Sequence, residues 1–325
     1  MTRVFSSLRT TAGRFAVNFA LLALLALVML VSMRFGSLKL TFAEIVGTLW
    51  NRPDGINGQI IFNIRLPRIL LGALVGGSLA AAGTILQGVM RNPLASPGII
   101  GVSAGGGLGG ILVMLVLPQF GYLLAVLVYL LAWKRGVNPV RLILAGVAVS
   151  AMLGAFSSTI LILNAEKAGG VLDFTIGSLS ARSWPQIEQV APYMAAGFAV
   201  ALMLGQKLNI LTLGDEVATG LGMRVERTRF LLLAVAALLA ASAVSVAGLL
   251  GFVGLIAPHI VRIVIGSDNR FLIPASALFG GIMVVGCDTV GRMAMDPSEL
   301  PVGVIMSLLG PPFFLWLLRR HSYEA

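Results

Sequence analysis

Charged residues are scarce in this sequence. Only 11% of its 325 residues are Asp, Glu, Lys or Arg, whereas an ordinary soluble domain has about 25%. Together with 58% hydrophobic residues and a mean hydropathy of +0.96, this scarcity excludes a soluble globular protein. The sequence has a single cysteine, Cys287, and two histidines. An internal disulfide is therefore excluded, and no metal site with clustered ligands is expected.

Nucleotide-binding motifs are also missing. No G-x-x-x-x-G-K-[ST] motif occurs, so the chain is not expected to bind ATP phosphates through a P-loop. Gly105, Gly107 and Gly110 match G-x-G-x-x-G, but no strand precedes them and no acidic residue follows within about 20 residues, which argues against a dinucleotide site. If the chain drives transport with ATP, another subunit must supply the energy.

Long stretches without charge predict transmembrane helices, each of about 20 residues. Residues 92–133 would form a helix of about 63 Å, twice the hydrocarbon core of about 30 Å, so a reversal is expected at Pro118–Gly121. Residues 230–261 are also too long for one span and are expected to reverse at Gly248, Gly251 and Gly254. The result is an all-α polytopic bundle of about ten helices in one transmembrane domain, 1–325. The uncharged stretches are 15–33, 69–90, 92–133, 142–165, 189–206, 230–261, 271–287 and 300–318.

The distribution of charge predicts the topology. With ten spans and a cytoplasmic N-terminus, the cytoplasmic side carries 15 basic and 5 acidic residues, and the outside carries 8 of each. Cytoplasmic loops are enriched in Lys and Arg, so both termini are expected in the cytoplasm, and the net charge of +10 needs no nucleic acid to explain it. The first stretch could be a signal peptide, but it lacks a cleavage site before Arg34 and is interpreted as a retained helix.

Glycines spaced four residues apart predict close helix packing. They place bare backbone on one helix face, so that a neighbouring helix can approach. These glycines are Gly72 and Gly76, and then Gly101, Gly105 and Gly109.

Two isolated polar residues allow more than one interpretation. Asp288 adjoins the ninth predicted span, in the stretch 271–287, and an acid at membrane depth can carry a proton in a secondary transporter. Arg292 lies one helical turn further on, so a structural ion pair is an equal alternative. His259 follows Pro258 near the end of the eighth span, where a helix-end residue is favoured over a metal ligand.

Two segments outside the predicted spans are candidates for functional sites. The longest cytoplasmic loop is 207–229, in which Asp215 can cap a short helix that ends at Gly220 or Gly222. This helix is either a solvated connection or a docking element for a cytoplasmic partner.

On the outside, Arg65 and Arg68 flank Pro67, and a residue before proline avoids helical geometry, so an extended entry into the second span is expected. Five of the eight external basic residues lie in this region, where they could bind lipid headgroups: Arg34, Lys39, Arg52, Arg65 and Arg68.

Several segments together resemble one family, the permease subunits of type II ATP-binding-cassette importers for iron-siderophore, haem and cobalamin complexes. The resemblance implies ten helices per subunit, a homodimer or pseudo-dimer around a central pathway, two ATPase subunits and a solute-binding protein. ATP and Mg²⁺ would bind the partner ATPase, and no cofactor is expected on this chain. The matching segments are RLPR (65–68), NPLASPGIIG (92–101) with Val102, Ser103 and Ala104, LAGV (144–147), 213–222, GFVGLIAPHIVR (251–262), and LPVG (300–303) with Leu309, Gly310 and Pro311.

The resemblance also implies roles for individual residues. Docking of the binding protein is implied for Arg65, Arg68 and Arg292, and the cytoplasmic gate for Asn92, Pro93 and Leu94. The fourth span, after Gly121, looks shorter than is usual in the family. Coupling to the ATPase is implied for Leu213, Gly214, Asp215, Glu216, Val217, Ala218, Gly220, Leu221 and Gly222.

The expected function is therefore that of an importer's permease subunit in the bacterial cytoplasmic membrane, carrying an iron-siderophore-type chelate by alternating access. It would be a transporter subunit and not an enzyme by itself. Haem or cobalamin as substrate remains an alternative. A secondary transporter that uses Asp288 as its ion carrier is the alternative from another class.

Overall fold

The computed structural model describes residues 7–36, 38, 40–51, 55–97, 168–295 and 298–321, with three residue pairs between 154 and 163. Several predictions lie outside these residues. They concern the third and fourth spans with their turn at Pro118–Gly121, most of the fifth span, LAGV, and the glycines from Gly101 to Gly110.

Each predicted span that falls on described residues has its helix. Within the described ranges, five helices are long and apolar enough to cross a membrane: α2 (Thr11–Arg34), the continuous helix Ile56–Met90, α10 (Trp184–Thr212), α12 (Val225–Ala247) and α14 (Asn269–Ala294). Two further apolar helices are α13 (Val253–Ile265) and α15 (Val302–His321). The remaining helices are α3 (Phe42–Asn51), α9 (Ala168–Ile176) and α11 (Asp215–Gly220).

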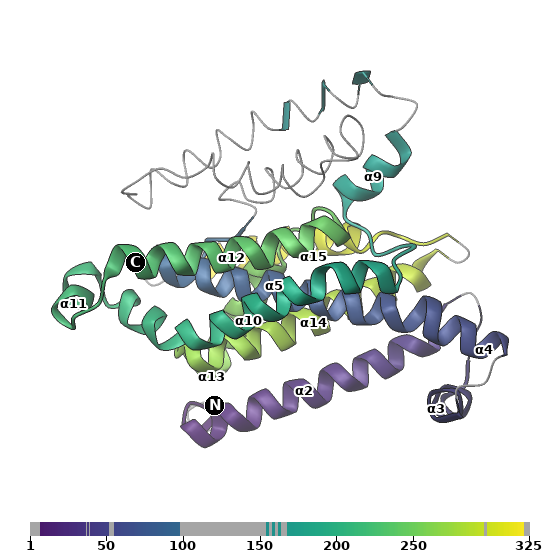
Figure 1. Ribbon diagram of the computed structural model, residues 1–325, viewed down its shortest axis with the longest axis horizontal. Coiled ribbons are helices and arrows are strands. Elements are labelled where there is room, and N and C mark those ends of the chain that lie inside the picture. Colours follow the sequence, from purple (N-terminus) through teal and green to yellow (C-terminus); the bar gives the residue numbers. More distant parts are fainter. Residues whose placement is uncertain are drawn as a thin grey trace.

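The helix Ile56–Met90 lies at the centre of the bundle (Figure 1). It consists of α4 (Ile56–Gln59), a π-helical segment η1 (Ile60–Arg65) and α5 (Leu66–Met90). α5 packs against α10, α12, α13 and α14, and 83% of the most apolar stretch of the central helix is buried, against 6% for α2. α2 is therefore peripheral, with its contacts mainly on α14.

The two ends of the bundle differ. α11, the start of α2 and the end of α15 lie at one end, here called the α11 end (Figure 1). α3, α4 and α9 lie at the opposite end, here called the α3 end. Of the described segments, α11 and the start of α2, which are predicted to be cytoplasmic, lie at the α11 end, and α3, α4 and α9, which are predicted to be external, lie at the α3 end (Figure 1).

The predicted extended entry at RLPR is wrong. Arg65 and Leu66 both have helical backbone angles, and the chain is helical from Ile56 onward. The physical reason is the π-helical segment, in which the Leu66 amide donates to the carbonyl of Ile61. A π turn is wider than an α turn and absorbs irregularity within a helix. Pro67 then lies at the second position of α5, directly after the π-helical segment, where the α-helical hydrogen-bond pattern is already interrupted.

Two predicted connections between spans can be compared with the structure. The predicted reversal between the seventh and eighth spans is confirmed, because α12 ends at Ala247 and Gly248 continues with φ +72° beside the carbonyl of Phe174. The cytoplasmic loop is shorter than predicted. α10 continues through Lys207 to Thr212 and α12 begins at Val225, since the few polar residues at these positions still fit helical turns.

Close packing at glycines holds α5 against its neighbours. A Cβ on Gly76 would lie 2.2 Å from the carbonyl oxygen of Gly280 in α14, and one on Gly83 would lie 1.9 Å from that of Gly254 in α13. Backbones this close exclude any side chain. The predicted packing role of Gly76 is thus confirmed.

Replacing Gly83 by valine is expected to push α5 and α13 apart. Overpacking in a well-filled interior costs about 1–3 kcal/mol or more, so the melting temperature of the purified protein should fall. Gly286→Val is the matched control, because a Cβ at Gly286 in α14 has no atom within 4 Å. Equal melting temperatures for the two variants, measured in the same detergent, would contradict the close contact.

Candidate functional site

Three buried arginines lie together at the α3 end. Arg65 comes from η1, Arg68 from α5 and Arg292 from α14, and their exposed fractions are 5%, 8% and 7%. Arginine is seldom buried without a partner. The contacts that compensate these three charges therefore define what the cluster can do.

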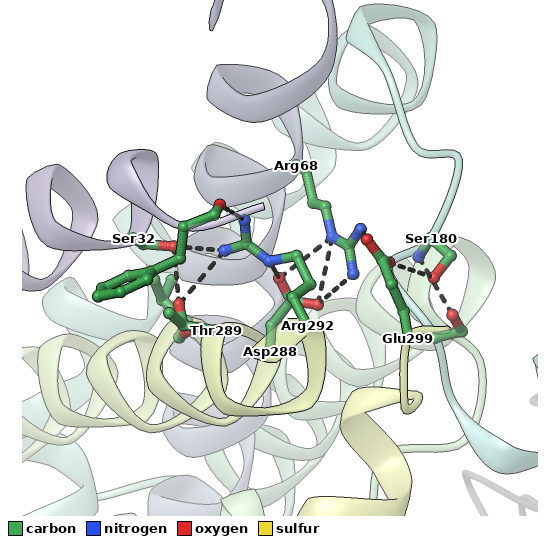
Figure 2. A network of polar contacts seen from close by, with 10 residues as sticks. Ser32, Arg68, Ser180, Asp288, Thr289, Arg292 and Glu299 are labelled. Atoms are coloured by element: carbon green, nitrogen blue, oxygen red, sulfur yellow. Dashed lines mark hydrogen bonds and ion pairs between the residues drawn. The ribbon is translucent and has the colours of Figure 1, made fainter. Parts of the chain in front are cut away.

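Asp288 lies between two of the arginines (Figure 2). Arg68 donates to its carboxylate through Nε at 3.1 Å and Nη2 at 2.8 Å, and Nε of Arg292 lies 3.1 Å from its Oδ2. Asp288 is 3% exposed. The predicted pair with Arg292 is thus present, and a bidentate contact with Arg68 adds to it. This arrangement favours a structural role for Asp288 over that of an ion carrier.

Arg65 and the two Nη atoms of Arg292 bind the end of α2 and the segment that follows it. The last carbonyls of a helix have no partner within the helix, and here two arginines supply the donors. The contacts run from Arg292 Nη1 to the Phe35 carbonyl (2.9 Å), from Arg292 Nη2 to Ser32 Oγ (2.6 Å), from Arg65 Nη1 to the Met33 carbonyl (2.5 Å) and from Arg65 Nη2 to the Leu38 carbonyl.

Glu299 is the part of this cluster that reaches solvent. Its side chain is 34% exposed, and its Oε2 accepts from Arg68 Nη1 at 2.7 Å and from Ser180 Oγ at 3.4 Å (Figure 2). Glu299 precedes α15, so it ties this helix to α5. Sequence reasoning did not single out Glu299, and its proximity to LPVG was the only signal.

The three arginines predicted to dock a partner are therefore adjacent, but their charges are bound within the chain. They do not form a freely exposed basic rim in the described structure, and docking stays a prediction. Reversing the charge of Arg68 would leave Asp288 with one arginine partner and a nearby negative charge, so such a variant would lose stability and not only docking.

At the α11 end, Asp215 connects three elements. Its Oδ1 accepts from Arg91 Nη2 at 2.9 Å, and its Oδ2 accepts from Arg229 Nη2 at 2.7 Å. Arg91 ends α5 in a left-handed conformation with φ +49°, and Arg229 lies in α12. The predicted cap was wrong by one residue. Gly214, with φ +115°, is the N-cap, because the Asp215 carboxylate is used by the two arginines.

α11 and the residues that flank it present apolar side chains to their surroundings. Leu213, Val217 and Leu221 are 61%, 49% and 63% exposed, whereas Ala218 is fully buried against the bundle. The helix ends at Gly220, one of the two predicted positions. Exposed apolar groups gathered on one protruding helix are typical of a protein interaction site.

The predicted gate residues follow α5 directly. The Asn92 amide donates to the carbonyl of Gln87 at 3.1 Å, and Asn92 Oδ1 accepts from the Leu94 amide at 2.9 Å. Gln87 Oε1 in turn accepts from Arg262 Nη2 of α13 at 2.8 Å. Pro93 lines an open hollow of about 480 Å³ with Arg9, His259, Arg262, Ile263, Gly266 and Ser267.

Sequence reasoning missed a second ionic cluster at the α11 end. Asp268 is the N-cap of α14 and accepts from Arg14 Nη1 at 3.0 Å, Arg270 Nη2 at 2.8 Å and Asn209 Nδ2 at 2.7 Å. Hydrogen bonds from Arg270, and a further one from Asn209, lower the pKa of Asp268 to about 2. The cluster joins the ends of α2, α10 and α14. Only the capping position of Asp268 was visible in the sequence.

Comparisons with known proteins agree with this architecture. Residues 24–320 match the FecCD transport family. The chain is 38% identical to the Fe(3+)-citrate import system permease protein YfmE of Bacillus subtilis, covering 85% of this chain and 90% of that protein. It is 44% identical to the cobalamin import system permease protein BtuC of Halobacterium salinarum, covering 82% and 75%.

Among solved structures, one described as an inward-facing conformation of a metal-chelate type ABC transporter aligns with a TM-score of 0.82 and 30% identity. The alignment covers 94% of this chain and 99% of that one. Its fold agrees with the helical membrane bundle described above. Because the family match spans most of the sequence and relatives of 38% and 44% identity align along most of its length, the chain belongs to the FecCD transport family.

Proposed function

We propose that this chain is the membrane-spanning permease subunit of an ATP-binding-cassette importer that carries an iron-siderophore-type chelate across the bacterial cytoplasmic membrane. The observation that carries this proposal is the family match over residues 24–320. Relatives named as permeases for ferric citrate and hydroxamate chelates support the substrate class. No covalent chemistry is required of the chain, which would alternate between outward-open and inward-open states.

The partners follow from the same proposal. Two ATPase subunits would bind at the α11 end, a solute-binding protein at the α3 end, and a second copy of this chain would complete the pathway. The α11 end is then cytoplasmic, in agreement with its excess of basic residues. ATP and Mg²⁺ would be held by the ATPase subunits.

α11 would transmit ATPase movement through Asp215. The exposed side chains of Leu213, Val217 and Leu221 provide the contact with the ATPase. Asp215 then joins α11 to Arg91, the residue directly before the gate segment that starts at Asn92. Both side chains of this pair are nearly half exposed, so the pair contributes little stability. The proposed role of the Arg91–Asp215 pair is to move the gate segment together with α11.

The arginine cluster could contact the binding protein only if a carboxylate of that protein replaced the carboxylate of Glu299 on Arg68. Glu299 now covers Arg68 Nη1 from the solvent side. An acidic side chain of the binding protein would have to displace Glu299 to reach that nitrogen. Arg65 and Arg292 would act by holding Asp288 and the end of α2 in place.

Haem and cobalamin remain alternative substrates, because relatives of 38% and 44% identity are named for them. The test is uptake in cells that express this chain as the only FecCD permease, together with its binding protein and ATPase. Labelled ferric siderophore, haem and cobalamin are offered separately. Uptake of the ferric siderophore alone is expected, and uptake of haem or cobalamin in its place would reassign the substrate.

A further inference from the structure

The short helix α3 differs in direction from the spanning helices. Figure 1 looks almost along the axis of α3, whereas α2 and the other long helices run across the view. α3 lies just beyond the last turn of α2, at the α3 end. Because α2 exposes apolar side chains along its length and the chain is a membrane permease, the end of α2 marks the level at which the bilayer gives way to water.

Three different sides can be distinguished around α3. Successive residues of an α-helix are rotated by about 100°. Ile45 and Thr48 face the protein, with exposed fractions of 1% and 5%. Phe42, Val46 and Trp50, each four residues apart, form an apolar stripe with exposed fractions of 46%, 59% and 87%.

The third side of α3 is polar. It carries Glu44 and Asn51, both exposed. The backbone amide of Thr41 donates to Glu44 Oε2 at 2.7 Å and holds the pKa of Glu44 below its ordinary value, so this side keeps its charge. With a rotation of about 100° per residue, the centre of the apolar stripe lies about 150° from the polar side and about 130° from the protein-facing side, and the polar and protein-facing sides are about 80° apart.

We propose that α3 lies in the plane of the outer membrane–water interface, with Phe42, Val46 and Trp50 inserted among the lipids and Glu44 and Asn51 in water. A helix with this division is suited to the interface, where tryptophan is enriched. The guanidinium of Arg34, 5.3 Å from the centre of the Phe42 ring, lies where it can bind a lipid phosphate. The apolar stripe thus continues the lipid-exposed surface of α2.

Three of the basic residues predicted outside now have separate roles. Arg65 and Arg68 serve the buried cluster, whereas Arg34 serves the headgroup region beside α3. The proposal rests on membrane insertion of the chain and not on which chelate it carries. A failure of the substrate assignment would leave it unaffected.

The test uses spin labels on single cysteines in a Cys287→Ser background, with the complete chain in proteoliposomes. Val46→Cys and Trp50→Cys report on the apolar stripe, and Asn51→Cys is the matched control on the polar side. Molecular oxygen concentrates in the bilayer, and a nickel chelate stays in water. Labels at positions 46 and 50 are expected to collide more with oxygen, and the label at position 51 more with the chelate.

Two results would overturn the proposal. If the labels at positions 46 and 50 collide with oxygen and with the chelate as often as the label at position 51 does, the stripe faces water. If positions 46 and 50 are shielded from both reagents, another protein surface, such as a second copy of the chain, covers the stripe. Melting temperatures of the labelled variants close to that of the Cys287→Ser parent establish that each label reports on the folded protein.

Discussion

Replacing Asp288 by asparagine is expected to destabilise the protein by about 3–5 kcal/mol, the usual effect of removing one partner from a buried ion pair. Arg68 and Arg292 would then remain buried with their shared negative charge gone. The loss should appear as a large drop in melting temperature in detergent. It should also appear as less protein in the membrane, because permanent unpaired charges are costly inside a bilayer.

Glu299→Gln is the matched control for this variant. Glu299 also binds Arg68, but its side chain is 34% exposed, so its loss should cost only about 0–1 kcal/mol. The result also separates the two interpretations of Asp288. A melting temperature that is unchanged in Asp288→Asn, combined with abolished transport, would contradict the structural role and favour an ion carrier.

Replacing Val217 and Leu221 together by aspartate is expected to abolish transport by preventing the ATPase from binding. Burial of one such side chain contributes about 1.5–3 kcal/mol, so losing two should weaken ATPase binding about a hundredfold or more. Both side chains are about half exposed or more, so the permease itself should stay folded. The measurement is co-purification of the ATPase with the permease, together with the melting temperature of the permease alone.

The control for α11 changes the same two positions without adding charge. Val217→Ile with Leu221→Met keeps the apolar surface and should retain ATPase binding and transport. Normal ATPase binding in the aspartate variant would show that α11 is only a connection. A lowered melting temperature in that variant would instead mean that α11 supports the fold.

The spanning helices could be predicted from the sequence because their signal is local. A stretch without charge that is long enough to cross the bilayer can be recognised from its own consecutive residues. α2, α10 and α14 correspond to three such stretches. The reversal at Gly248 was predictable for the same reason, since one helix could not accommodate 230–261. RLPR was misinterpreted, because a rule for single residues before proline does not anticipate a π turn.

The partners of the polar residues could not be predicted, because they lie far apart in the sequence. Arg68 and Asp288 are separated by 220 residues, and Arg91 and Asp215 by 124. Only the packing of α5 against α14 and the approach of α11 to the end of α5 bring them together. Sequence resemblance identified the three arginines, but it could not show that their charges are already bound within the chain.

Reconstituted uptake tests the central proposal most directly. The chain, its ATPase and its binding protein are incorporated into proteoliposomes, and accumulation of a labelled ferric siderophore is measured with ATP and Mg²⁺ on the ATPase side. We expect uptake that requires ATP hydrolysis, persists when a protonophore and ionophores remove all ion gradients, and disappears in the Val217→Asp, Leu221→Asp variant. Uptake driven by a proton or ion gradient without ATP would contradict the proposal.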